Sequence, residues 1–273
     1  MRGFAKAFVF SALLGVLALP SIGADIATTP AVADDNEGEY AHKPEAQDFI
    51  HGAPEAPTEA WTLAAGGRIY DNWWEALDRE EPKTTHPNYP KTGKQEGAVT
   101  WRCKECHAWD YRGKDGIYGK GSHFTGFPGI DGAIGKPVEA IAAALRDKTH
   151  GYTVEMIKDD ELARVAAFVS RGQVDMGKYV DLKTRKIIAG NVDRGREIFQ
   201  TTCAACHGFD GRLLNWGSKE EPAYVGTEGR DVPDEVLHKI LNAHTGVQMI
   251  NLRAFPVENA VDVLAYTATL PEK

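Results

Sequence analysis

Two segments of the chain share the pattern Cys-x-x-Cys-His: CKECH at residues 103–107 and CAACH at residues 203–207. Together they contain all 4 cysteines of the 273-residue chain. A cysteine pair with this spacing, followed directly by histidine, is the attachment pattern of a c-type haem. In that chemistry the two sulfurs form thioethers with the porphyrin vinyl groups, and the histidine binds the iron as its proximal ligand.

Other uses of paired cysteines fit this spacing less well. The two pairs of a zinc ribbon usually lie about 15–20 residues apart, and a thioredoxin-like site needs only one pair and no histidine. A disulfide framework would spread its cysteines along the chain. We therefore expect two covalently bound haem c groups, with His107 and His207 as proximal iron ligands, attached through Cys103, Cys106, Cys203 and Cys206.

The segments before the two motifs resemble each other. Gly66 and Tyr70 precede the first motif with the same spacing of four that separates Gly195 and Phe199 before the second. Residues four apart lie on one face of a helix. Each glycine should therefore let another helix cross closely, with the aromatic ring packed beside it.

The segments after the motifs also match. In each half we expect a helix opened by proline in its first turn, then a loop with a histidine and a methionine, then a final helix with an aromatic residue. The helices are KPVEAIAAALRD from Lys136 and VPDEVLHKILNA from Val232, the loops are 150–156 and 244–249, and the final helices are 161–170 and 260–269.

This order of elements resembles the class I cytochrome c family, repeated once in each half of the chain. The likeness is to dihaem proteins with two fused cytochrome c domains, cytochrome c4-like or thiosulfate dehydrogenase-like. It implies an all-α fold of two tandem class I cytochrome c domains, each with about three main helices around a covalent haem. The domains would be residues 61–172 and 192–273, joined by a linker at 173–191.

The first half departs from the family pattern. Between Tyr70 and Cys103 lie 32 residues, where the second half has 3. The proline, glycine and charged residues of this insertion, residues 71–102, predict turns and loops. We interpret it first as a cover over the haem, although long loops of this kind are often functional.

The resemblance assigns the second axial ligand of each iron to the methionine in the loop before the final helix, Met156 or Met249. The alternative is that these methionines pack in the hydrophobic core, as most methionines do. Met176 and His150 are rival ligands for the first haem, and His244 is a rival for the second. His86 and His123 are weaker candidates, and His238 should pack in a helix or face solvent.

The proximal histidines need an acceptor for their other ring nitrogen, commonly a backbone carbonyl. In the family that this sequence resembles, a loop with a proline supplies it. The segments around Pro128 and Pro222 are the matching positions in the two halves.

The N-terminus predicts export. Arg2 and Lys6 precede an apolar run at residues 7–19, and small residues follow. This is the pattern of a signal peptide, residues 1–24, with a second possible cut after Ala33. An uncleaved membrane anchor fits less well because the run is short. We expect a disordered acidic, proline-rich arm at residues 25–60 and a periplasmic protein with no transmembrane segment in the mature chain.

The formal net charge of −8 argues against a nucleic-acid partner. The resemblance implies electron relay between a donor and an acceptor protein. A docking face for an acidic redox partner would consist of Arg102, Lys104, Arg112, Lys114 and Lys120. The alternatives are a cytochrome subunit of a periplasmic dehydrogenase, or a dihaem enzyme with its active site at the first haem. That enzyme would be peroxidase-like or thiosulfate dehydrogenase-like. No cysteine remains for the axial cysteine ligand of the familiar thiosulfate dehydrogenases.

Overall fold

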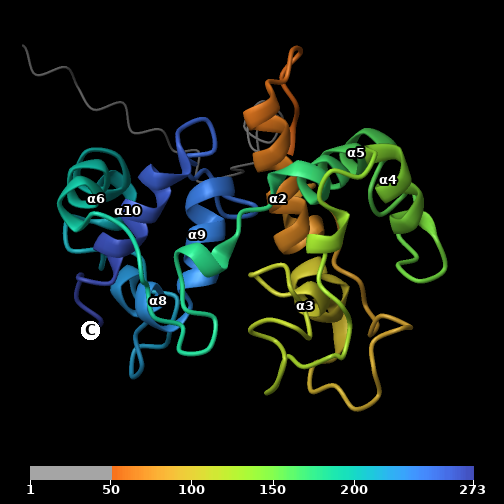
Figure 1. The fold of residues 1–273 in the computed structure, drawn as a ribbon, viewed down its shortest axis with the longest axis horizontal. Coiled ribbons are helices and arrows are strands. Elements are labelled where there is room, and N and C mark those ends of the chain that lie inside the picture. Colours follow the sequence, from red (N-terminus) through yellow and green to blue (C-terminus); the bar gives the residue numbers. More distant parts are fainter. Residues whose placement is uncertain (1–50) are drawn as a thin grey trace, which may run out of the picture. The chain divides into compact units, whose positions relative to one another are not determined.

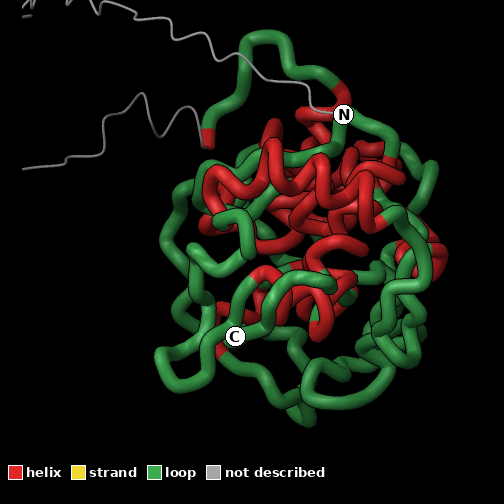
Figure 2. The backbone as a smooth tube through the Cα atoms, turned by 90° about the vertical axis from the view of Figure 1, so that its left-hand side faces the viewer, coloured by secondary structure: helices red, strands yellow, loops and turns green. Residues whose placement is uncertain are grey.

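The computed structural model describes residues 51–273, which form helices joined by loops and contain no β-strand (Figures 1 and 2). The fold is therefore all-α, as predicted. The predicted signal peptide and most of the predicted arm lie outside the described residues. No helix within residues 51–273 combines the length and apolar character needed to cross a membrane.

The helices fall into two sets, which we call the first half and the second half. The first half contains α2 (Glu59–Ala76), α3 (Cys103–His107), α4 (Val138–Arg146) and α5 (Asp159–Ala167), with short 3-10 segments at Gly97–Trp101, Asp131–Ala133 and Met176–Lys178. The second half contains α6 (Val192–Ile198), α7 (Ala204–His207), α8 (Val225–Asp231), α9 (Pro233–Asn242) and α10 (Val257–Thr267). A π-helical turn extends α5 over Phe168–Gly172, and another extends α6 over Phe199–Cys203.

In each half the helix before the motif packs against the last helix, α2 on α5 and α6 on α10. A Cβ atom on Gly66 would clash with the carbonyl oxygen of Arg164, and one on Gly195 would clash with that of Asp262. The predicted glycine contacts are thereby confirmed.

The aromatic residues lie beside these crossings. The ring of Tyr70 lies 5.5 Å from that of Phe168, and Phe199 lies 5.4 Å from Tyr266, measured between centroids. Aromatic pairs at this separation add stability beyond the area they bury. The same crossing therefore forms twice, as the repeated spacing predicts.

The residues just before Trp61, expected in the arm, contact the rest of the chain. Thr58 caps α2 by accepting a hydrogen bond from the Trp61 amide at 3.1 Å. Glu59 forms an ion pair with Arg171, and His51 hydrogen-bonds the carbonyl of Ala76 at 3.1 Å. Helix α2 therefore begins before the predicted domain boundary.

The two halves share one hydrophobic core. His238 of α9 is fully buried, and burial lowers its pKa to about 4, so its ring is neutral. Its Nε2–H donates to the Gly67 carbonyl at 3.0 Å, and its Nδ1 accepts from the Tyr111 hydroxyl at 2.8 Å. His238 thus packs, one of its two expected roles, and joins the halves through hydrogen bonds that satisfy both ring nitrogens.

The predicted linker also contacts the halves. Met176 and Val180 are fully buried in the shared core. Arg185 pairs with the buried carboxylate of Asp234 on α9 at 2.5 Å. The segment therefore holds the halves together and is itself anchored.

Replacing Gly66 or Gly195 with alanine should destabilise the protein, because the new methyl group meets a backbone carbonyl that cannot move independently of its helix. We expect each change to lower the free energy of unfolding by about 1–3 kcal/mol, the usual range for overpacking. Denaturant unfolding of the holoprotein measures it. Gly177→Ala is the control, since its Cβ would meet neighbours at 3.4 Å or more. Equal stability of all three variants would contradict the close crossings.

Candidate functional site

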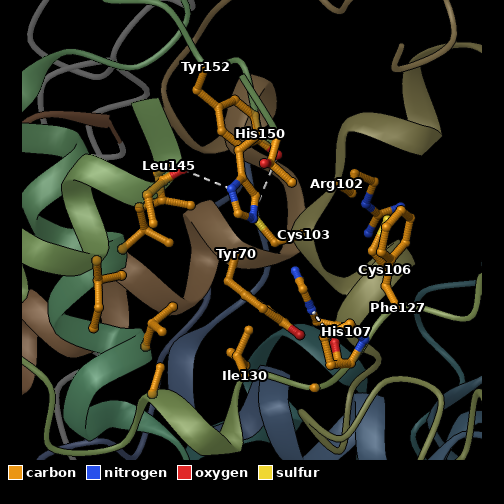
Figure 3. A pocket seen from close by; sticks show the side chains of 18 of the residues that line it. Tyr70, Arg102, Cys103, Cys106, His107, Phe127, Ile130, Leu145, His150 and Tyr152 are labelled. Carbon is orange, nitrogen blue, oxygen red and sulfur yellow. Dashed lines mark hydrogen bonds between the residues drawn. The ribbon is translucent and has the colours of Figure 1, made fainter. Parts of the chain in front are cut away.

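The first motif forms α3, which lines a cavity of about 610 Å³ (Figure 3). Cofactor pockets typically measure ~300–1,000 Å³ and are mostly apolar. Cys103, Cys106 and His107 all line this cavity. Apolar side chains from α4 and α5 complete it, among them Ile141, Leu145 and Val165. The cavity therefore brings the motif together with the two following helices.

His107 is held by the backbone of the loop before α4. Its Nδ1 lies 2.7 Å from the carbonyl oxygen of Pro128, so the predicted proline loop is confirmed in the first half. Burial lowers the pKa of His107 to about 4, with the hydrogen bond to Pro128 opposing the shift. The ring is therefore neutral near pH 7. Its Nδ1–H donates to Pro128, which leaves the Nε2 lone pair available to a metal.

The cysteines of the first motif are free thiols in the cavity wall. Burial raises the pKa of Cys103 to about 11 and that of Cys106 to about 12, so both are protonated at neutral pH. The Cys103 sulfur lies 3.7 Å from the Tyr152 hydroxyl, which donates to the Trp101 carbonyl at 2.7 Å. Two thiols, an imidazole with an available nitrogen and an apolar cavity fit a covalently attached haem c.

A second histidine ring lies across this cavity. His150, which follows α4, faces His107 with the ring centroids 6.3 Å apart and the planes at 33° (Figure 3). Its Nδ1 lies 2.8 Å from the carbonyl oxygen of Ala144. The two rings thus have the same arrangement, with each Nδ1 bound to a backbone carbonyl.

The methionines predicted near the first haem lie elsewhere. Met156 is not among the described residues that line the cavity, and it is partly buried against the core. Met176 is fully buried in that core and does not line the cavity either.

The remaining histidine candidates of the first half also have partners. His86 lines the cavity, and its Nε2 lies 2.9 Å from the carbonyl oxygen of His150. His123 hydrogen-bonds the buried carboxylate of Glu105 at 2.7 Å and stacks on Tyr118. Both are engaged within the protein.

The second motif lies at the junction of the π-helical turn and α7. The His207 ring lies 6.4 Å from that of Phe199 and 5.8 Å from that of Trp216. Burial lowers its pKa, and His244 contributes to the shift. Its buried Nδ1 has no hydrogen-bond partner within residues 51–273, so the bond expected from the Pro222 carbonyl is not formed there.

Apolar side chains around the second motif are exposed. The exposed fractions are 75% for Phe209, 66% for Leu213 and 48% for Trp216. Met249, the predicted axial ligand, is partly buried in the loop before α10. An imidazole beside exposed apolar side chains fits a large apolar cofactor at this motif.

Most of the predicted basic docking face is paired inside the fold. Arg102 forms an ion pair with the buried Asp71, and Lys104 is buried against Glu105 at 3.1 Å. Arg112 pairs with Asp175 at 3.0 Å. Only Lys114 and Lys120 of the five are exposed and without an ion pair in this part of the chain.

Two comparisons with known proteins identify the family of the chain. The family described as "Cytochrome C oxidase, cbb3-type, subunit III" matches residues 190–266, which include the second motif. A cytochrome c-553-like protein of Synechocystis sp. is 34% identical over 85 residues, which make up 30% of this chain and 72% of the relative. The chain belongs to the cytochrome c family. No solved structure matches this cytochrome.

Two residues at the first site were not anticipated from the sequence of this cytochrome. Tyr152 contacts Cys103, and Asn88 of the insertion binds the loop that carries His150. Tyr152 lies two residues after His150, so the matched loops were a signal that could have drawn attention to it. Nothing in the insertion's composition singles out Asn88.

Asp71 anchors the start of the first motif. Burial raises its pKa, but Lys239 and Arg102 outweigh that effect and lower the pKa below its ordinary value. Arg102, the residue before Cys103, also donates through Nε to the Asp71 carbonyl at 2.7 Å. The buried carboxylate thus ties α2 to α3 and, through Lys239, to α9.

Asp71→Asn should lower the free energy of unfolding by about 3 kcal/mol at pH 7, as when one partner of a buried ion pair is removed. The ionised carboxylate stabilises the folded protein fully at pH values above its pKa in the unfolded chain, about 3.9. This stabilisation is lost as the pH falls through the lower pKa that Asp71 has in the folded protein. The difference in free energy of unfolding between wild type and variant should therefore become smaller below about pH 4. Denaturant unfolding against pH measures it, with the exposed Glu80→Gln as control. A constant gap at all pH values would contradict this role.

Proposed function

We propose that this cytochrome is an exported, periplasmic dihaem carrier that relays electrons between a donor and an acceptor protein. The observation that carries the proposal is the repetition of the Cys-x-x-Cys-His motif, each copy at the same place in a matching set of helices. One haem would be bound covalently to Cys103 and Cys106, with His107 as a ligand of its iron. The other would be attached through Cys203 and Cys206, with His207 and Met249 as axial ligands.

The protein's own residues would provide a dry and rigid setting at the first site. The apolar side chains of α4 and α5 would shield a haem in the cavity from water, and the Pro128 carbonyl fixes the orientation of the His107 ring. A bound haem c would supply reversible one-electron chemistry, while the protein sets its burial and its ligands. Fixed ligands favour electron transfer because little has to move when the charge changes.

The shared core supports transfer between the two haems. Tyr111, which follows the first motif, is hydrogen-bonded to His238 of α9 in the second half. The described residues, 51–273, all belong to a single compact unit. The two sites would therefore keep a constant separation during the relay, which supports a carrier with two tandem cytochrome c domains.

A cytochrome subunit of a larger redox complex is the second candidate. The family that matches residues 190–266 is described as a subunit of an oxidase, which favours this alternative for the second half. In either role the protein would dock on a redox partner. The support for an acidic partner is limited to Lys114 and Lys120, because the other basic residues near the first motif are paired.

The haem content tests the proposal directly. Mass spectrometry of the holoprotein should give the mass of the mature chain plus two haems. Replacing Cys103 and Cys106 with alanine should remove one haem, and replacing Cys203 and Cys206 should remove the other. The matched pair of variants serves as mutual control. A wild-type protein with a single haem would contradict the dihaem carrier.

Met249→Ala should abolish the methionine–iron absorption of the second haem and lower its reduction potential, because methionine ligation raises the potential. Redox titration followed by optical spectroscopy measures both effects. Met176→Ala is the control, since that side chain lies in the core. An unchanged spectrum of the second haem in Met249→Ala would show that another residue is the ligand.

A further inference from the structure

The two histidines at the first site are spaced as two ligands of one metal. A metal–imidazole bond is about 2 Å long, so two imidazoles on opposite sides of one metal place their coordinating nitrogens about 4 Å apart. Each ring centre lies roughly one ring radius further out. The observed centroid separation of 6.3 Å between His107 and His150 matches this arrangement.

Both rings also have their Nδ1 atom bound to a backbone carbonyl. The Nδ1 of His107 is bound to the Pro128 carbonyl, and the Nδ1 of His150 is bound to the Ala144 carbonyl in the last turn of α4. A histidine whose Nδ1–H donates to a carbonyl presents the lone pair of Nε2 to a metal. His150 thus has the hydrogen bond that metal-binding histidines nearly always have, and its acceptor is a carbonyl of helix α4.

The insertion unique to the first half holds the loop of His150 in place. Asn88 donates through Nδ2 to the carbonyls of Lys148 and Thr149, at 3.0 and 2.8 Å. The Nε2 of His86 lies 2.9 Å from the carbonyl of His150 itself. Three successive carbonyls of one loop are therefore bound by side chains from the insertion. We call these contacts the loop clamp.

The matching histidine of the second half lacks this setting. The carbonyl that corresponds to Ala144 belongs to His238, and it already accepts a hydrogen bond from the Asn242 side chain at 2.8 Å. The Nδ1 of His244 instead lies 2.8 Å from the carbonyl of its neighbour Thr245. The second half also has no insertion between its aromatic residue and its motif. The two halves therefore differ at the residue that faces the proximal histidine.

We infer that His150, held by the loop clamp, is the second axial ligand of the first haem, in place of Met156. This inference rests on the proposed function, because it presupposes a haem at the first motif. The first haem would then have two histidine ligands and the second a histidine and a methionine. Methionine raises the reduction potential, so the first haem would have the lower potential, and electrons would pass from the first half to the second.

The ligand pair can be tested on the wild-type holoprotein. Electron paramagnetic resonance and near-infrared magnetic circular dichroism distinguish bis-histidine haem from histidine–methionine haem. We expect one haem of each type, with two separate steps in a redox titration. Two histidine–methionine haems, or a high-spin first haem, would overturn the inference. Mass spectrometry on the same sample separates this failure from that of the proposed function, which would show fewer than two haems.

Variants then assign the ligand. His150→Ala should convert only the first haem to a high-spin form that binds carbon monoxide when reduced, while Met156→Ala should leave both signals as in wild type. The opposite result would identify Met156 as the ligand and overturn the inference. If His150→Ala does not fold, His150→Met gives the same information, since it should replace the bis-histidine signal with a second histidine–methionine signal.

The loop clamp has its own test. Asn88→Ala should keep the bis-histidine signal but let His150 leave the iron more often, because two hydrogen bonds to its loop are lost. We expect carbon monoxide to bind the reduced first haem roughly tenfold faster, the weight of one to two net hydrogen bonds. Asn215→Ala is the matched control: it removes an exposed asparagine that bonds a loop carbonyl in the second half. Equal rates in the two variants would show that the clamp does not position His150.

Discussion

Metal-binding imidazoles in proteins nearly always have their second ring nitrogen held by an acceptor, and the first half of this cytochrome forms that contact. The Nδ1 atom of His107 is bound by the Pro128 carbonyl at 2.7 Å. Gly113 and Gly129 allow the loop to approach this closely, because a Cβ atom on either would strike backbone atoms of the facing segment. The apolar cavity then keeps the ring neutral.

The same constraint explains why the two halves differ although their helices match. In the first half, residues 71–102 supply side chains that bind the loop after α4 and extra walls for the cavity. In the second half, 3 residues join the aromatic position to the motif, and Phe209, Leu213 and Trp216 remain exposed. One helix arrangement thus carries one site with a lined cavity and one site with exposed apolar side chains. The difference comes from the loops, which tolerate insertion better than the helices do.

The sequence was sufficient to predict what depends on local pattern. The spacing of Gly66 and Tyr70 predicts a close helix crossing, and the structure has that crossing at Arg164 and Phe168. The same holds for the Pro128 loop, whose carbonyl lies 2.7 Å from the Nδ1 atom of His107. The glycine–aromatic spacing occurs before both motifs, so a single sequence is enough to reveal it.

Contacts over long separations could not be predicted in this way. Asp71 and Lys239 are 168 positions apart, and no pattern in either segment indicates that they meet. The buried position of Lys104 is equally hidden, because a lysine beside other basic residues is normally expected on a solvated face. His150 was one of several ligand candidates, and only the cavity shows that it faces His107 while Met156 does not line it.

The differences between the two halves bear on the direction of electron transfer, and the shared core bears on the distance between the two sites. A carrier with two similar haems would have no preferred direction, since neither site would hold an electron more tightly. With the ligands that we propose, the two sites would differ, while the hydrogen bond between Tyr111 and His238 keeps the halves together. Because His238 is neutral and fully buried, this junction does not change with pH near neutrality. The core would therefore fix the separation of the two proposed haems, and the loops would determine the difference between their reduction potentials.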